Sequence, residues 1–299
     1  MKKNILFLML SIGIFNFCFS QEWLTSLETA KRVALVQNKF LLMIWEDAAL
    51  IPYPVLMNDE KGNTILVENL FDYDEINRVI WDYFVPVKLN ERVYSELYEQ
   101  IKNTRSRTYM AQFEDDNIKI VDVNLNIINT SDGLEAYSNL SKFLSKYALN
   151  TSFLNADLRN YLLQKDFGTA FRLASKYFDY AILVHNNVRE DIIQISDLYL
   201  DEAIAFLPDS RLEEHGNFEQ KAKLLGLSKF LLKNKPRKVQ RQLKKIQTSE
   251  IDQTNKALLA FLYYTSYQLQ KDEKNAELWK SEVSLVDLKR AELIIKLQS

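Results

Sequence analysis

Two adjacent carboxylates, Glu46 and Asp47, directly follow the apolar run Phe40–Trp45 and are the first residues whose types could do acid–base chemistry. A carboxylate pair can supply a general acid and a general base when both groups point at one substrate. Neighbouring residues in a chain point in different directions, so we favour a solvated loop at this position. The alternative is an enzyme of unknown reaction that uses the carboxylates of residues 46–69.

A second group of oxygen-bearing side chains, Asp122, Asn124 and Asn126, begins like a calcium-binding loop. Ile127 stands where such a loop needs glycine, and Gly133 stands where the bidentate glutamate belongs. The spacing therefore favours a hairpin turn over a calcium site.

The two histidines of the chain, His185 and His215, are far apart in the sequence and have no partner at helical spacing. We interpret both as helix-surface or partly packed residues. The sequence also lacks a glycine-rich phosphate loop and the common nucleophile motifs. We expect no catalytic residue, no metal and no cofactor.

The stretch from Gly226 to Ser249 contains eight basic residues and no acidic one. From Pro236 onward, Val239, Leu243 and Ile246 recur at helical spacing and predict a buried stripe. The remaining face would carry Arg237, Lys238, Arg241, Lys244 and Lys245. Such a face can be merely solvated, or it can dock an acidic protein or an anionic envelope component.

The elements that must position these residues differ between the two halves of the chain. Residues 23–149 alternate between helix and strand, which predicts an α/β domain with parallel strands and one antiparallel hairpin. We expect strands at 40–45, 84–89, 118–123 and 126–129, and helices after Ser26 and at 74–83, 91–101 and 134–147. Residues 46–73 form an inserted segment, with a hairpin or protruding loop around Gly62.

From residue 150 to residue 299 the pattern is one of helical hairpins, and it contains an internal repeat. The residues from Tyr161 to Ala170 match those from Tyr267 to Ala276 as Y-x-L-Q-K-D-x-x-x-A. A weaker copy begins at Phe230, and all three copies fit a unit of about 35 residues, close to that of tetratricopeptide repeats. The pattern predicts an aromatic residue late in one helix packing near a small residue of the next, although one such match can arise by chance.

Residues 1–20 are typical of a secretory signal peptide, with two lysines, an apolar run and the small residues Cys18 and Ser20. A retained anchor helix is the alternative. Cys18 is the only cysteine, so residues 21–299 can form neither a disulfide nor a thiolate site. Those residues carry 36 basic and 40 acidic side chains, a formal charge of −4, which does not favour nucleic-acid binding.

The first half resembles the thioredoxin fold in its exported bacterial branch. The residues that carry the resemblance are Trp23-Leu24, Leu27-Glu28, Ala30-Lys31, Asn38-Lys39, Leu41–Met43, Trp45, Phe84–Asn90 and the Asp122–Asn126 turn. The resemblance implies a Trp-Cys-x-x-Cys site and a cis-proline facing it. Here Trp45 is followed by Glu46, Asp47, Ala48 and Ala49, and Asp116 and Asn117 hold the proline position.

Both halves of the dithiol site are thus missing, and we expect a degenerate site without redox activity. The second half resembles tetratricopeptide-like helical hairpins more loosely. The sequence as a whole predicts a signal peptide at 1–20, a thioredoxin-like domain at 21–149 and an all-α helical-repeat domain at 150–299. We expect a protein of the periplasm or cell envelope, without a transmembrane segment, that acts as a scaffold or holdase by binding a protein or peptide.

Overall fold

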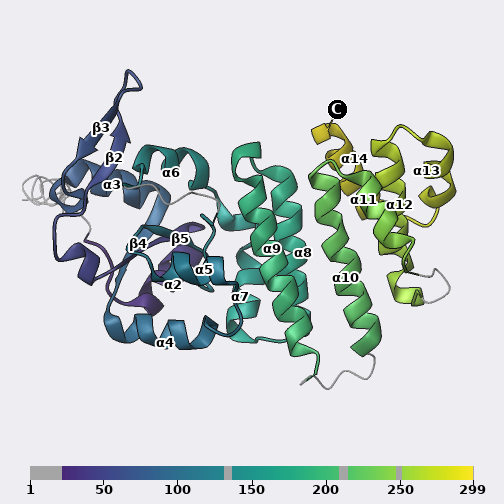
Figure 1. Ribbon diagram of the computed structural model, residues 1–299, viewed down its shortest axis with the longest axis horizontal. Coiled ribbons are helices and arrows are strands. Elements are labelled where there is room, and N and C mark those ends of the chain that lie inside the picture. Colours follow the sequence, from purple (N-terminus) through teal and green to yellow (C-terminus); the bar gives the residue numbers. More distant parts are fainter. Residues whose placement is uncertain (1–21, 131–136, 209–214, 247–250, 299) are drawn as a thin grey trace, which may run out of the picture.

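The structure is a computed structural model that describes residues 22–130, 137–208, 215–246 and 251–298 (Figure 1). The expected signal peptide and residues 134–136 of the expected closing helix lie outside these residues. The strands are β1 (Phe40–Trp45), β2 (Val55–Asn58), β3 (Thr64–Val67), β4 (Phe84–Leu89) and β5 (Lys119–Val121). The helices are α2 (Leu27–Gln37), α3 (Asp74–Tyr83), α4 (Glu91–Ile101), α5 (Arg107–Glu114), α6 (Leu140–Tyr147), α7 (Asn155–Leu163), α8 (Phe167–Leu183), α9 (Asn186–Phe206), α10 (His215–Leu232), α11 (Pro236–Leu243), α12 (Lys256–Leu269), α13 (Glu273–Lys280) and α14 (Leu285–Gln298).

The first part of the chain is a small α/β unit built around strand β1. Every residue of β1 is buried, as its continuous apolar sequence predicts. β4 pairs with β1 in parallel and β5 pairs with it antiparallel, in the order β4-β1-β5. Isolated bridges extend this sheet at both sides, from Leu24 to Val87 and from Ile127 to Val121. The expected mixed α/β layout is therefore confirmed.

Local signals explain where several of these elements begin. The side chain of Ser26 accepts a hydrogen bond from the backbone N–H of Thr29 and caps α2, as expected. α2 ends at Asn38, which adopts the left-handed conformation with φ 54°. The inserted segment forms the β2–β3 hairpin, and its Gly62 has φ 83°, which glycine adopts without strain.

Three expectations for the α/β unit differ from the structure. Residues 126–129 make only a single bridge, because the Asn129 side chain bonds the backbone of Ile118 and Ile120 in place of a continued ladder. The closing helix begins at Leu140, where Asn139 caps it by accepting from the N–H of Lys142. Helix α5 was not expected from the sequence.

The second part of the chain is made of helices within the described residues, which confirms the helical layout. Each repeat copy lies across a helix–turn–helix junction, at α7–α8, α10–α11 and α12–α13. The positions predicted to be close-packed in the second helix, Ala170, Val239 and Ala276, are fully buried. Asp166 and Asp272 cap the second helices of the first and last copies. These positions are compatible with a repeated helical hairpin.

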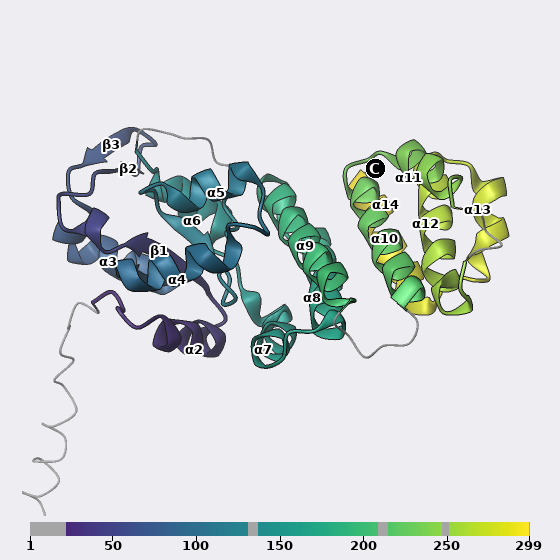
Figure 2. The ribbon, with the colours of Figure 1, turned by 60° about the horizontal axis from the view of Figure 1, so that its bottom comes forward.

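The two parts share one continuous cluster of buried apolar side chains, which runs from Ala30 in α2 to Ile294 in α14. Figure 1 shows α8 and α9 between the α/β unit at one end and α10–α14 at the other, and Figure 2 shows the same order from a second side. Residue 149 marks a change in element type rather than a gap in the core. No helix among the described residues is long and apolar enough to cross a membrane.

Candidate functional site

Trp45 lies at the end of β1, where the resemblance implies a redox site. Its indole N–H donates to the carbonyl oxygen of Asp115 at 2.9 Å, and its ring packs edge-on against Tyr94 and Phe113. Lys119 places its ammonium 5.0 Å from the centre of the same ring. Trp45 is thus held by four partners in a packed corner of the α/β unit.

The four residues after Trp45 are positioned by the backbone. The N–H of Glu46 donates to the carbonyl oxygen of Leu89 at 2.8 Å, and Asp47–Ala49 form one short 3₁₀ turn. Asp47 is exposed, whereas Glu46, Ala48 and Ala49 are half-buried. A 3₁₀ turn of three residues presents few free backbone N–H donors. This segment therefore does not provide the helix N-terminus that would stabilise a thiolate.

Asn117 lies in the Asp115–Lys119 turn, two residues after the Asp115 carbonyl that Trp45 bonds. Its backbone N–H donates to Oδ1 of Asp115 at 2.9 Å, and its carbonyl oxygen accepts from Lys119. The structure therefore brings Trp45 and Asn117 together through Asp115. The peptide bonds of the described residues include no cis bond at this turn.

Lys119 is a charged group at this corner, and its side chain is 1% exposed. Its ammonium donates to Asp115 Oδ1 at 3.0 Å, to the carbonyl oxygen of Asp115 at 2.5 Å and to that of Asn117 at 2.9 Å. Burial lowers the pKa of Lys119, while the Asp115 carboxylate raises it. Three acceptors saturate the three donors of an ammonium, so Lys119 is built as a structural cation rather than a nucleophile.

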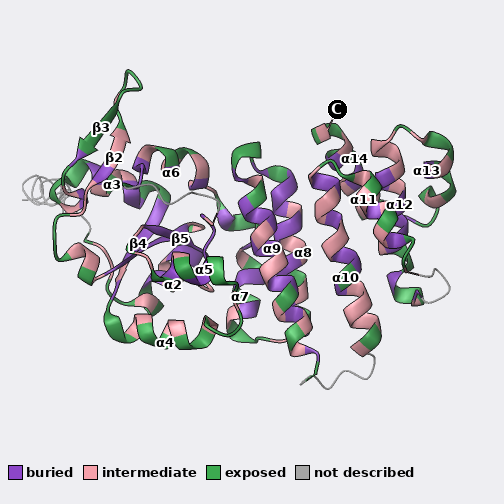
Figure 3. Ribbon diagram, viewed as in Figure 1, coloured by how far each residue is buried: buried purple, intermediate pink, exposed green. Residues whose placement is uncertain are grey.

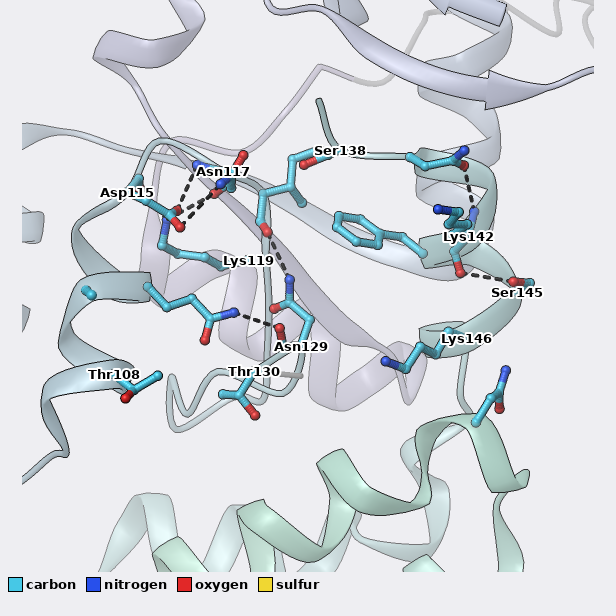
Figure 4. A pocket seen from close by; sticks show the side chains of 16 residues that line it. Thr108, Asp115, Asn117, Lys119, Asn129, Thr130, Ser138, Lys142, Ser145 and Lys146 are labelled. Atoms are coloured by element: carbon cyan, nitrogen blue, oxygen red, sulfur yellow. Dashed lines mark hydrogen bonds and ion pairs between the residues drawn. The ribbon is translucent and has the colours of Figure 1, made fainter. Parts of the chain in front are cut away.

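A cavity of about 640 Å³ lies beside this turn, between α5, β5 and α6 (Figure 4). Gln112 donates to the carbonyl oxygen of Asn129 at 2.7 Å, and Lys146 forms an ion pair with Asp191 at 3.0 Å. Thr130 bonds Gln194 of α9. Much of the polar wall is thus committed to bonds inside the chain, so the cavity offers little free polar chemistry to a ligand.

A second cavity of about 470 Å³ lies where α2 and α4 face α7 and α9. Its wall includes Arg105, whose side chain is 7% exposed and forms an ion pair with Glu202. Neither cavity is lined by a carboxylate of residues 46–69. Of the described residues, no three histidines or carboxylates gather in a way that could hold a metal ion.

The sequence did not predict that Asp122 would join the two parts of the chain. Its fully buried carboxylate accepts from the hydroxyls of Tyr177 at 3.0 Å and Tyr199 at 2.6 Å, and from the N–H groups of Asn124 and Asn126. Burial raises the pKa of Asp122, and these four hydrogen bonds lower it. The Asp122–Asn126 turn is therefore an anchor for α8 and α9.

Helix α11 and the turn that follows it carry the five cations of the predicted basic face, Arg237, Lys238, Arg241, Lys244 and Lys245. Val239 and Leu243 are fully buried and Ile246 is partly buried, so the predicted stripe is confirmed. Four of the five cations are exposed, and the fifth, Lys238, lies 3.9 Å from the ring centre of Phe230.

The basic face differs from helix α10 in its ion pairs. Two lysines of α10 reach carboxylates of α9, because Lys229 pairs with Asp197 at 2.8 Å and Lys233 with Glu190 at 2.5 Å. Among the described residues, no ion pair involves a cation of the basic face.

Comparison with known proteins gives no similar chain, since no protein-family model, no curated protein and no solved structure matches this one.

Proposed function

We propose that this chain is an exported, redox-inactive protein with a thioredoxin-like domain and a tetratricopeptide-like helical domain, and that it acts by binding another protein in the periplasm or cell envelope. It would serve there as a scaffold or as a holdase. Residues 1–20 support the location through their signal-like composition. The order of the sheet, with β1 central, β4 parallel and β5 antiparallel, supports the thioredoxin-like fold.

The observation that carries the binding role is the basic face of α11. It presents four exposed cations in a protein whose residues 21–299 carry a formal charge of −4. Other basic side chains of the helical part, such as Lys229, Lys233 and Arg290, pair with carboxylates inside the chain. An exposed cluster of one sign steers and orients partners of the opposite sign. We therefore assign the basic face to docking of an acidic protein.

The proposed absence of redox activity can be tested directly. Residues 21–299 contain no cysteine, so the purified protein that lacks residues 1–20 has no thiol to exchange with a disulfide. It should reduce insulin no faster than a control without protein. Turnover above that control in cofactor-free material would contradict the proposal.

Docking of a partner on the basic face is tested by charge reversal. The variant Arg237→Glu, Arg241→Glu, Lys244→Glu should lose the partner that wild-type protein captures from an envelope extract. Its fold should be retained, because the buried Val239 and Leu243 are unchanged.

A matched control reverses three exposed lysines elsewhere in the helical part: Lys256→Glu, Lys274→Glu, Lys289→Glu. It changes the net charge by the same amount and should keep the partner. Equal capture by all three proteins would leave the basic face as a solvated surface. Retention of anionic lipid in place of a protein would reassign the face to an envelope component.

A further inference from the structure

The inserted β2–β3 hairpin has a hydrogen-bond pattern that can be assigned residue by residue. The N–H of Asp59 donates to the carbonyl oxygen of Asn63 at 2.9 Å, which makes 59 and 63 a hydrogen-bonded pair. In an antiparallel ladder such pairs alternate with pairs whose backbone groups point outward. The next hydrogen-bonded pairs are therefore Met57 with Ile65 and Val55 with Val67.

The backbone N–H groups of β2 that point away from β3 confirm this alternation, because they donate to the segment on the other side of β2. The N–H of Leu56 donates to the carbonyl oxygen of Ser138 at 2.9 Å, and the N–H of Asn58 donates to Oγ of Ser141 at 2.9 Å. β2 thus lies between β3 and the segment that leads into α6, as Figure 1 shows. One edge of the hairpin is covered by the chain itself.

The opposite edge, formed by β3, is open. By the same alternation, Thr64 and Leu66 point their N–H and carbonyl groups away from β2. In the part of the chain that the structure describes, these groups have no further hydrogen-bond partner. Ile65 is 48% and Leu66 is 54% exposed, and Figure 3 shows β3 as an exposed strand.

Proteins protect open edges with proline, charged side chains or a bulge, or by keeping the edge strand short, since an unprotected edge pairs with other chains. The four residues of β3, Thr-Ile-Leu-Val, make a short strand that includes neither a proline nor a charged side chain. A short apolar edge with outward backbone groups is the geometry that accepts an added strand from a partner.

We propose that β3 is a docking edge for an extended apolar segment of a partner protein whose flanking residues are basic. Residues 58–68, which form the tip of the hairpin and β3, contain the carboxylates of Asp59, Glu60 and Glu68 and one lysine, Lys61, a net charge of −2. Basic flanks would complement this charge, whereas pairing with β3 of a second copy would bring two acidic edges together. The inference is independent of the basic face on α11.

The experiment uses the full folded protein lacking residues 1–20 and a defined probe, the acetylated peptide Lys-Lys-Val-Thr-Val-Thr-Val-Lys-Lys. The matched control peptide carries glutamate in place of each lysine. Fluorescence anisotropy should show binding of the lysine peptide and at least about tenfold weaker binding of the glutamate peptide, a difference of about 1.4 kcal/mol. Equal binding of the two would overturn the charge assignment.

Amide hydrogen exchange then locates the contact without any substitution. The amides of Thr64 and Leu66 should become protected when the lysine peptide binds, while those of Ile65 and Val67, already bonded to β2, should change little. Protection of the Thr64 and Leu66 amides, without a change at Ile65 and Val67, supports addition of the peptide as a strand beside β3. No binding, or binding without protection of Thr64 and Leu66, overturns the proposal.

Two substitutions at position 66 separate the contribution of the backbone N–H from that of the side chain. Leu66→Pro removes the outward N–H and should abolish peptide binding, while Leu66→Thr keeps that N–H and should retain most of it. Protection of the Ile65 amide in Leu66→Pro reports that the hairpin is intact. The α11 charge-reversal variant should bind the lysine peptide like wild type, so failure of one surface is distinguishable from failure of the other.

Discussion

Two groups of basic side chains in this chain have opposite surroundings. Arg105, Lys119 and Lys146 lie in the α/β unit, are largely buried and each form an ion pair with a carboxylate. The cations of the basic face on α11 are mostly exposed, and the described residues provide them with no carboxylate. The first group is built into the folded core, and the second is the surface proposed for docking.

The comparison shows that the effect of a charged side chain on stability depends on its burial and on its partners. A buried ion pair is costly to break, because the remaining charge has neither water nor a counter-ion. An exposed cation contributes little to stability and can be exchanged at small cost. Stability and binding should therefore respond to different residues of the same type.

The largest effect is expected at Asp122. Asp122→Ala leaves the hydroxyls of Tyr177 and Tyr199 and two backbone N–H groups without their acceptor, and buried unsatisfied groups cost about 1–3 kcal/mol each. We expect a loss of at least about 3 kcal/mol in the free energy of unfolding, measured by urea titration. Asp116→Ala, at an exposed carboxylate, should change it by less than about 0.5 kcal/mol. Equal losses would contradict the anchoring role.

The next effect compares two arginines directly. Arg105→Met leaves the Glu202 carboxylate with the Tyr161 hydroxyl but without its counter-ion, and should cost about 3 kcal/mol, because removing one partner of a buried pair is strongly destabilising. Arg241→Met in the basic face should cost less than about 0.5 kcal/mol. Urea unfolding of both variants provides the measurement. A larger loss for Arg241 would reverse the comparison.

A smaller effect is expected from pH. The pKa of Asp122 is raised above its ordinary value of 3.8 by burial, so the folded chain holds the proton more tightly than the unfolded chain. The contribution of Asp122 to stability is therefore greatest below pH 3.8 and decreases as the pH rises through the folded pKa, above which it is constant.

The variant Asp122→Asn removes this titration and serves as the reference. The free energy of unfolding of wild type minus that of Asp122→Asn should fall as the pH is raised from about 4 and then level off. A difference that grows with pH would mean that the four hydrogen bonds outweigh burial and that the pKa is lowered.

The sequence predicted the features of the fold that depend on neighbouring residues. β1 was predictable from six consecutive apolar residues, and the start of α2 from Ser26. The stripe on α11 was predictable because helical spacing alone defines it. Helix α5 was not predicted, since it is only eight residues long and its cap, Ser106, resembles an ordinary loop serine.

The remaining features depend on residues far apart in the chain. Asp122 meets Tyr177 and Tyr199, which follow it by 55 and 77 residues. The open edge of β3 follows from the phase of its hydrogen bonds, which the sequence does not contain. The spacing of neighbouring residues therefore predicts the basic face, whereas the buried anchor and the strand edge depend on contacts between distant residues.

The central claim, docking of an acidic protein on the basic face of α11, is tested most directly by the salt dependence of capture. Exposed charges are screened over about 8 Å at physiological ionic strength, so wild type and the Lys256, Lys274, Lys289 control should release the partner as salt is raised from about 50 mM to about 500 mM. The charge-reversal variant at Arg237, Arg241 and Lys244 should not capture it at any salt concentration. Capture by wild type that is unchanged over this range would contradict the claim.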